Sequence, residues 1–179
     1  MSLTLAEASR LWDDIPVPTD EGMAEVELAR VEQAFGFGFN PDHRVLLAAG
    51  LPIGGRWPDW RNPESPTLRA MLDAPVDGVL FDVEQNDFWF AAWGRRPSDV
   101  GEALEVARTR LQSVPRLVPV YGHRYAPALP EDGLPVLSVV QTDVVVYGVD
   151  IEDYLRREFG LRPEGGVEAK PVPFWTEAA

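Results

Sequence analysis

Apolar residues in the first part of the chain recur at the three- and four-residue spacing of amphipathic helices. Two helix starts are marked by caps: Asn40 precedes Pro41, and Ser65 precedes Pro66, so each places a capping side chain before a proline in the first turn. Spacing and caps together predict four helices, over residues 3–13, 23–35, 41–50 and 66–73.

After Pro75 the apolar positions change to a period of two. Val79, Phe81 and Val83 alternate with Leu80, Asp82 and Glu84, which predicts a strand over 79–84. Residues 85–87 then look like a turn before a second strand over 88–92, so this region is expected to form a hairpin.

The last part of the chain returns to helix and then to strands. Ser98-Asp99 caps a predicted helix that Pro115 ends, and Asp150 caps another. The remaining predictions are strands over 117–121, 135–140 and 144–148, a proline-rich loop over 123–133, a helix over 151–159, and an irregular tail over 161–179 in which Phe174-Trp175 packs back onto the body.

Helices and short strands are therefore interspersed along the chain, but a helix does not follow every strand. This order predicts an α+β fold, with a mostly antiparallel mixed sheet of four to six strands flanked by helices, rather than a doubly wound parallel sheet. A length of 179 residues is close to the usual size of one domain, so a single domain over residues 1–179 is expected, with its core at about 23–160.

The composition limits the kinds of functional site that the chain can form. The chain has no cysteine and only two histidines, so neither a Cys- or His-based metal site nor any cofactor is expected. The N-terminus has no signal-peptide pattern and no apolar stretch approaches the ~20 residues of a membrane span, which predicts a cytoplasmic protein without membrane contact.

The net charge is −13, and Lys170 is the single lysine. Two interpretations stay open: the composition of a GC-rich genome, or an acidic face that steers a basic partner. In either case repulsion from phosphate argues against binding to nucleic acid.

No catalytic motif is evident, and we expect a protein that is not an enzyme. Gly54-Gly55-Arg56 lacks the spacing and lysine of a phosphate loop. A hydrolase would have to combine His123 with a serine such as Ser138 and an acid such as Asp143, but there is no Gly-x-Ser-x-Gly turn to expose the hydroxyl. His123 is therefore interpreted as a structural residue.

Aromatic and arginine residues are the most informative side chains. Residues 57–61 read Trp-Pro-Asp-Trp-Arg in a predicted loop, and residues 88–93 hold four more large aromatic side chains. Phe88, Trp89 and Trp93 are interpreted as core. Tryptophan, tyrosine and arginine are common interface anchors. For Trp57, Trp60 and Arg61 two interpretations stay open, core or exposed interface. On the interface interpretation, in which Trp60, Arg61, Arg95, Arg124 and Tyr125 are exposed around a cleft, the candidate binding residues are Trp57, Trp60, Arg61, Arg95, Arg124 and Tyr125.

The sequence resembles the SUKH superfamily, which includes fungal cell-wall-assembly regulators and bacterial toxin-immunity proteins. The likeness extends over about residues 23–160 and is carried by four blocks: 27–47, with its Phe-Gly turn and Pro-Asp helix start; 51–61; 80–97; and 119–148, which contains Tyr121-Gly122-His123-Arg124-Tyr125. The chain has Ala49-Gly50 where many members have Asn-Gly.

The resemblance implies an α+β domain without catalytic machinery. It further implies a protein-binding module, most concretely an immunity protein that neutralises a basic nuclease or deaminase toxin by direct binding. The alternative is a small-ligand or glycan-binding regulatory domain in which Trp57 and Trp60 form a stacking platform.

Overall fold

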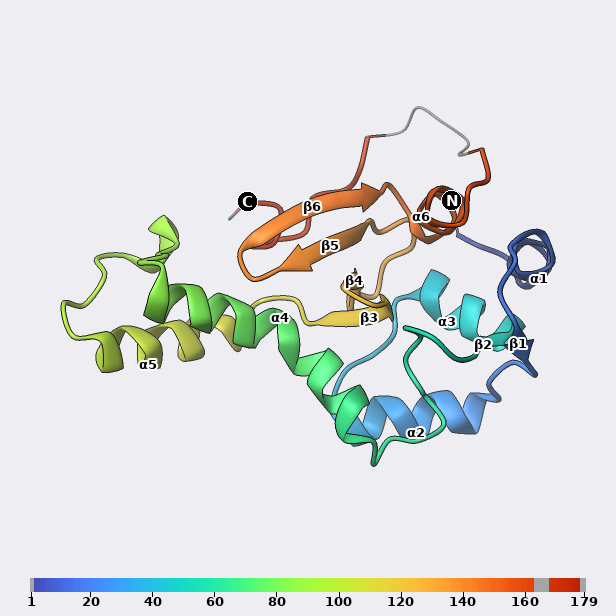
Figure 1. The fold of residues 1–179 in the computed structure, drawn as a ribbon, viewed down its shortest axis with the longest axis horizontal. Coiled ribbons are helices and arrows are strands. Elements are labelled where there is room, and N and C mark those ends of the chain that lie inside the picture. The colour runs from blue at the N-terminus through green and yellow to red at the C-terminus, as the bar shows by residue number, and fades with distance from the viewer. Residues whose placement is uncertain (1, 163–167, 178–179) are drawn as a thin grey trace.

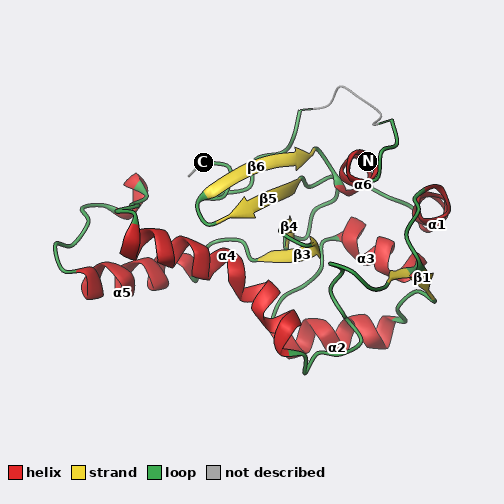
Figure 2. Cartoon of the chain, viewed as in Figure 1, coloured by secondary structure: helices red, strands yellow, loops and turns green. Residues whose placement is uncertain are grey.

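The computed structural model describes residues 2–162 and 168–177, and within them it is an α+β fold (Figures 1 and 2). The predicted single domain over 1–179 and the tail over 161–179 include positions 1, 163–167 and 178–179, which lie outside the described residues. The elements in chain order are α1 (Leu5–Asp14), β1 (Thr19–Asp20), α2 (Glu25–Phe35), α3 (Pro41–Ala49), β2 (Leu51–Pro52), α4 (Pro66–Gln85), the short 3-10 helix η1 (Ala91–Trp93), α5 (Val100–Leu111), β3 (Leu117–Tyr121), β4 (Arg124–Pro127), β5 (Val136–Val140), β6 (Asp143–Gly148) and α6 (Ile151–Glu158).

The main sheet is an antiparallel meander in the order β3-β4-β5-β6, and β1 pairs with β2 in a separate two-stranded sheet. The three strands predicted after residue 115 are confirmed. The prediction of a loop over 123–133 is wrong in its first part, because Arg124–Pro127 forms β4. Its prolines do not interrupt the pairing, since Pro127 is the last residue of the strand.

The predicted helix starts are also confirmed. The Asn40 side chain accepts a hydrogen bond from the His43 N–H at 2.8 Å, and the Ser65 hydroxyl accepts one from Leu68 at 3.4 Å. Asp99 and Asp150 cap α5 and α6 in the same way. Each cap satisfies an N–H that the first turn of a helix leaves unpaired.

The predicted hairpin over 79–92 is wrong. Residues 66–85 form one helix, α4, and residues 88–90 form no strand before η1. Within the helix, Leu72, Val79 and Val83 are buried at helical spacing, whereas Phe81 is exposed. The alternation in this stretch therefore arose from a helix that buries one side only.

Pro75 lies inside α4 and has no N–H to donate to the carbonyl of Met71, four residues earlier. The hydroxyl of Tyr125, on β4, donates to this carbonyl at a distance of 3.1 Å. Burial raises the pKa of Tyr125 to about 12, so the hydroxyl keeps its proton. A side chain from the sheet thus supplies the hydrogen bond that the proline removes, and the helix continues.

Other elements pack on both faces of the sheet, completely on one face and in part on the other. Tyr125, Leu137 and Val144 face a cluster built from α4, η1, α5 and the tail, while Val136 and Ala126 face α1, α3 and α6. Phe174 and Trp175 join the first cluster, with the Trp175 ring N–H donating to the carbonyl of Pro115 at 2.7 Å, which confirms that the tail packs back. Figure 1 shows α4 and α5 side by side, extending beyond the sheet.

Candidate functional site

The six candidate residues do not surround one cleft. Trp60 is buried, with 1% of its surface exposed, so the expectation that it lies on the surface is wrong. The backbone N–H of Trp60 donates to the carbonyl of Pro58. This tight turn directs the indole ring inward against Phe39, with ring centres 5.1 Å apart. The neighbouring Arg61 is exposed and pairs with Glu27 at 2.9 Å.

Two further candidates lie on other parts of the fold. Tyr125 is buried on the α4 side of the sheet, so the expectation that it is exposed is also wrong. It is buried because its hydroxyl donates a hydrogen bond to the Met71 carbonyl of α4. Arg95 is exposed between η1 and α5.

Trp57 and Arg124 lie at the other end of the sheet, where aromatic rings cluster. The ring centre of Trp57 is 4.7 Å from that of Tyr121 and 5.8 Å from that of Phe159. The planes of the Trp57 and Phe159 rings are 16° from parallel. Trp57 is therefore half-buried against Tyr121, the last residue of β3, and Phe159, which follows α6.

One face of the hairpin β5–β6 is not covered. Pairing places Arg124 opposite Ser138, and Ser138 opposite Val145, so these side chains share a face. Alternation adds Val140 and Tyr147 to the same face. Val140, Val145 and Tyr147 are 53%, 52% and 38% exposed. We call these five residues the open sheet face.

This face is open because α6 is short. Helix α6 has only eight residues and packs on the sheet through Tyr154 and Leu155, which are fully buried. It ends at Glu158, which leaves Val140 and Val145 uncovered. An apolar area of this kind next to charged groups is typical of a contact surface.

Arg124 is the charged centre of the open sheet face. Its guanidinium donates to the hydroxyl of Ser138 at 3.0 Å and lies 4.0 Å from the ring centre of Tyr147, a cation–π contact. Its Nε is 3.6 Å from an oxygen of Glu158, an ion pair too long for a hydrogen bond. Among the described residues neither of these two atoms has a hydrogen-bond partner, nor does the Tyr154 hydroxyl. Burial, with the nearby charge of Glu158 second, raises the pKa of Tyr154.

His123 borders this face and contacts a second arginine. Its Nδ1 is 3.0 Å from Nη2 of Arg56. Burial lowers the pKa of His123, and the positive charges of Arg124 and Arg56 lower it further, so the ring is neutral near pH 7. Within the described part of the chain no hydrogen bond joins His123 to Ser138 or Asp143. The Ser138 hydroxyl is instead held by Arg124.

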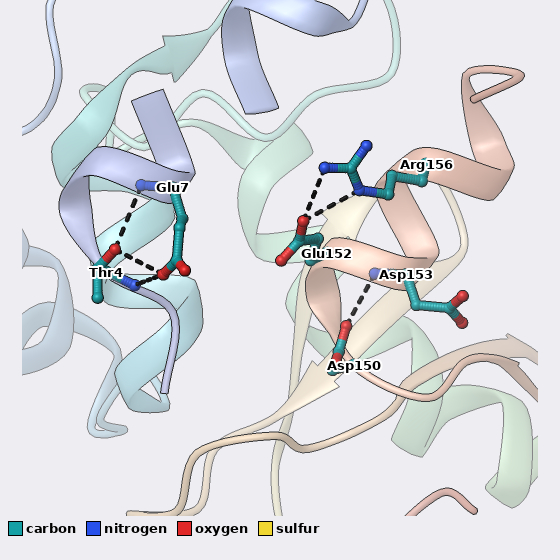
Figure 3. A network of polar contacts seen from close by, with 6 residues as sticks. All are labelled: Thr4, Glu7, Asp150, Glu152, Asp153 and Arg156. Carbon is teal, nitrogen blue, oxygen red and sulfur yellow. Dashed lines mark hydrogen bonds and ion pairs between the residues drawn. The ribbon is translucent and has the colours of Figure 1, made fainter. Parts of the chain in front are cut away.

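Acidic side chains gather beyond the end of β6. There the first turns of α1 and α6 come close together, each closed by its cap (Figure 3). Glu7, Asp150 and Glu152 line a recess of about 360 Å³ between them. Asp150 accepts from the Asp153 N–H, and Glu152 pairs with Arg156 at 2.9 Å (Figure 3).

His43 is the other histidine, and it belongs to the core. It is buried against the rings of Phe39 and Trp60, and burial lowers its pKa to about 3. Over the residues that the structure describes, no three His, Asp or Glu side chains are arranged to hold a metal ion. In the same residues no helix is long and apolar enough to cross a membrane.

The open sheet face was missed by sequence reasoning, apart from Arg124. The signal was present as Val144-Val145-Val146-Tyr147, an apolar run that was assigned to a strand. No protein-family model matches the chain, and no solved structure matches it.

Proposed function

We propose that this chain is a non-catalytic module that binds a basic protein. In its most concrete form it is an immunity protein of the SUKH type, which acts in the cytoplasm and covers a nuclease or deaminase toxin. The resemblance in sequence supports the type of protein, and the charge of the chain supports the type of partner.

The observation that carries the proposal is the excess of negative charge. The chain holds 29 acidic residues against 16 basic ones. Many of the basic side chains are already paired with the chain's own acids, as in the pairs of Arg61 with Glu27 and Arg108 with Glu105. The uncompensated charge is therefore acidic, and such a field speeds association with a cationic partner.

A toxin that acts on nucleic acid supplies the matching charge, because it must hold a phosphate backbone. The open sheet face adds an apolar contact area with Arg124 at its centre. Charge brings such partners together, and buried apolar and aromatic contacts provide most of the affinity.

The glycan-binding alternative has less support. A stacking platform needs exposed rings side by side, but Trp60 is buried and Trp57 is covered on one side by Phe159. The two rings that were expected to form the platform therefore do not form one.

The test is affinity capture from lysate of the source cells at about 50 mM salt, well below physiological screening. We expect a basic protein to be retained, identified by mass spectrometry, and then purified for titration. Its dissociation constant should rise at least about tenfold when salt is raised from 50 to 500 mM. The control is an unrelated protein of the same size and net charge, which should retain nothing specific. Capture equal to that control, or a salt-independent constant, would contradict the proposal.

A further inference from the structure

Among the residues that the structure describes, no strand pairs with the outer edge of β6, and little along this edge blocks pairing. The sheet order ends with β6, whose other edge pairs with β5. With six residues, β6 is the longest strand, and it contains neither lysine nor proline. The opposite edge, β3, contains Pro119 in its middle with a register shift beside it, whereas the register shift of β6 lies near its end, at Tyr147. Edge strands are normally protected by such features because unpaired N–H and C=O groups attract other strands.

Both sides of this edge are apolar. Val145 and Tyr147 belong to the open sheet face, and Val146 points to the other side but is also exposed. A strand added beside β6 would therefore find apolar neighbours on each face of the extended sheet.

Acidic groups lie at both ends of β6. Asp143 is its first residue and is exposed. Beyond its last residue, Asp150 and Glu152 line the acidic recess. The cations nearby are matched by the chain's own acids: Arg156 pairs with Glu152, and Lys170, which also lines the recess, pairs with Glu131 and Asp132. Arg124 lies against the Tyr147 ring and pairs with Glu158. The edge thus presents an apolar centre between two acidic ends.

This charge pattern decides between two occupants. Antiparallel pairing of β6 with β6 of a second copy would bring Asp143 of one copy close to the end of the other that holds Asp150. Parallel pairing would set Asp143 beside Asp143. Both arrangements oppose like charges, in copies that each carry a net charge of −13. A segment with an apolar centre and basic ends matches the edge instead.

We propose that β6 is a docking strand: an extended segment of the basic partner pairs with its free edge, placing β-branched side chains beside Val145 and Val146 and lysine or arginine near the acids at each end. This inference rests on the proposed function and names its contact site. Backbone hydrogen bonds would give affinity, and the two charged ends would fix the register.

A labelled peptide, RKVTVTVKR, tests the inference by fluorescence anisotropy at low salt. We expect saturable binding. Binding should be at least about tenfold weaker for EEVTVTVEE, in which the charge is reversed, and for RKVTPTVKR, in which proline removes a backbone donor. Hydrogen exchange should show new protection confined to residues 143–148. Absence of binding, equal binding of the proline peptide, or protection elsewhere would overturn the inference.

The matched variants are Val145→Lys with Val146→Lys, and, as a control with the same added charge, Val26→Lys with Phe81→Lys. Val26 is 75% exposed on α2 and Phe81 is 47% exposed on α4, so the control adds two lysines at exposed apolar positions on helices. The β6 double variant should bind the peptide at least about tenfold more weakly, and the control should bind like wild type. Equal loss in both would indicate a general charge effect and overturn the assignment to β6.

Failure of this inference is distinguishable from failure of the proposed function. A purified basic partner that binds the β6 double variant as tightly as wild type would reject the docking strand and keep the proposed function. Absence of any salt-sensitive basic partner would reject the proposed function. Sedimentation of the free protein completes the test, because a dimer that the double variant dissociates would assign the edge to a second copy.

Discussion

Neighbouring residues in the loop 57–61 have opposite environments. Trp60 is enclosed by Phe37, Phe39 and His43, while Arg61 is at the surface with Glu27. The sequence predicts an aromatic loop but not which ring points inward, because that depends on contacts with side chains about 20 residues away. Helix caps such as Asn40 act over three residues, and for this reason they were predictable.

The first prediction compares these two neighbours. Trp60→Ala is expected to lower the free energy of unfolding by about 3–5 kcal/mol, because it leaves a large cavity among packed rings. Arg61→Ala should shift it far less, since the ion pair with Glu27 is solvated. Urea unfolding followed by circular dichroism measures both. Similar losses for the two variants would contradict the burial of Trp60.

At the level of elements, the error over 79–92 has a specific cause. A proline followed by alternating apolar residues indicates a strand, and no local feature shows that Pro75 is tolerated inside a helix. The compensating group is Tyr125, 50 positions away in the sequence. The strands after residue 115 were predicted because their apolar runs are short and bounded by turn residues such as Gly122 and Gly133.

The second prediction tests that compensation with a double-mutant cycle. Tyr125→Phe should destabilise the protein by about 1–3 kcal/mol, because the Met71 carbonyl loses its donor. In a Pro75→Ala background a backbone N–H is available to this carbonyl, so the same change should cost at least about 0.5 kcal/mol less. Urea unfolding of the four proteins gives the coupling energy. Additive effects would show that the Tyr125 hydroxyl does not repair the helix.

At the scale of the whole molecule, the acidic character was evident from composition, but the open sheet face was not. A continuous run such as Val144–Tyr147 is typical of a strand buried on both faces. Its last three residues are exposed here because β6 is the last strand of the sheet and α6, which follows it, is too short to cover the hairpin. Exposure of this kind is a property of strand order and helix length together, and no single segment encodes it.

The last prediction follows from the net charge of −13, which should act with opposite sign on folding and on binding. Like charges repel within the folded chain, so raising sodium chloride from about 10 to 150 mM should raise the melting temperature by a few degrees. The same salt should weaken the complex with a basic partner, because it screens the attraction between the two proteins. Calorimetry of the free protein and titration of the complex measure the two effects in one buffer series.

A melting temperature that falls with salt would mean that ion pairs such as Arg124 with Glu158 outweigh the repulsion. A salt-independent affinity beside a rising melting temperature would mean that the acidic surface serves the chain's solubility and does not recognise the partner.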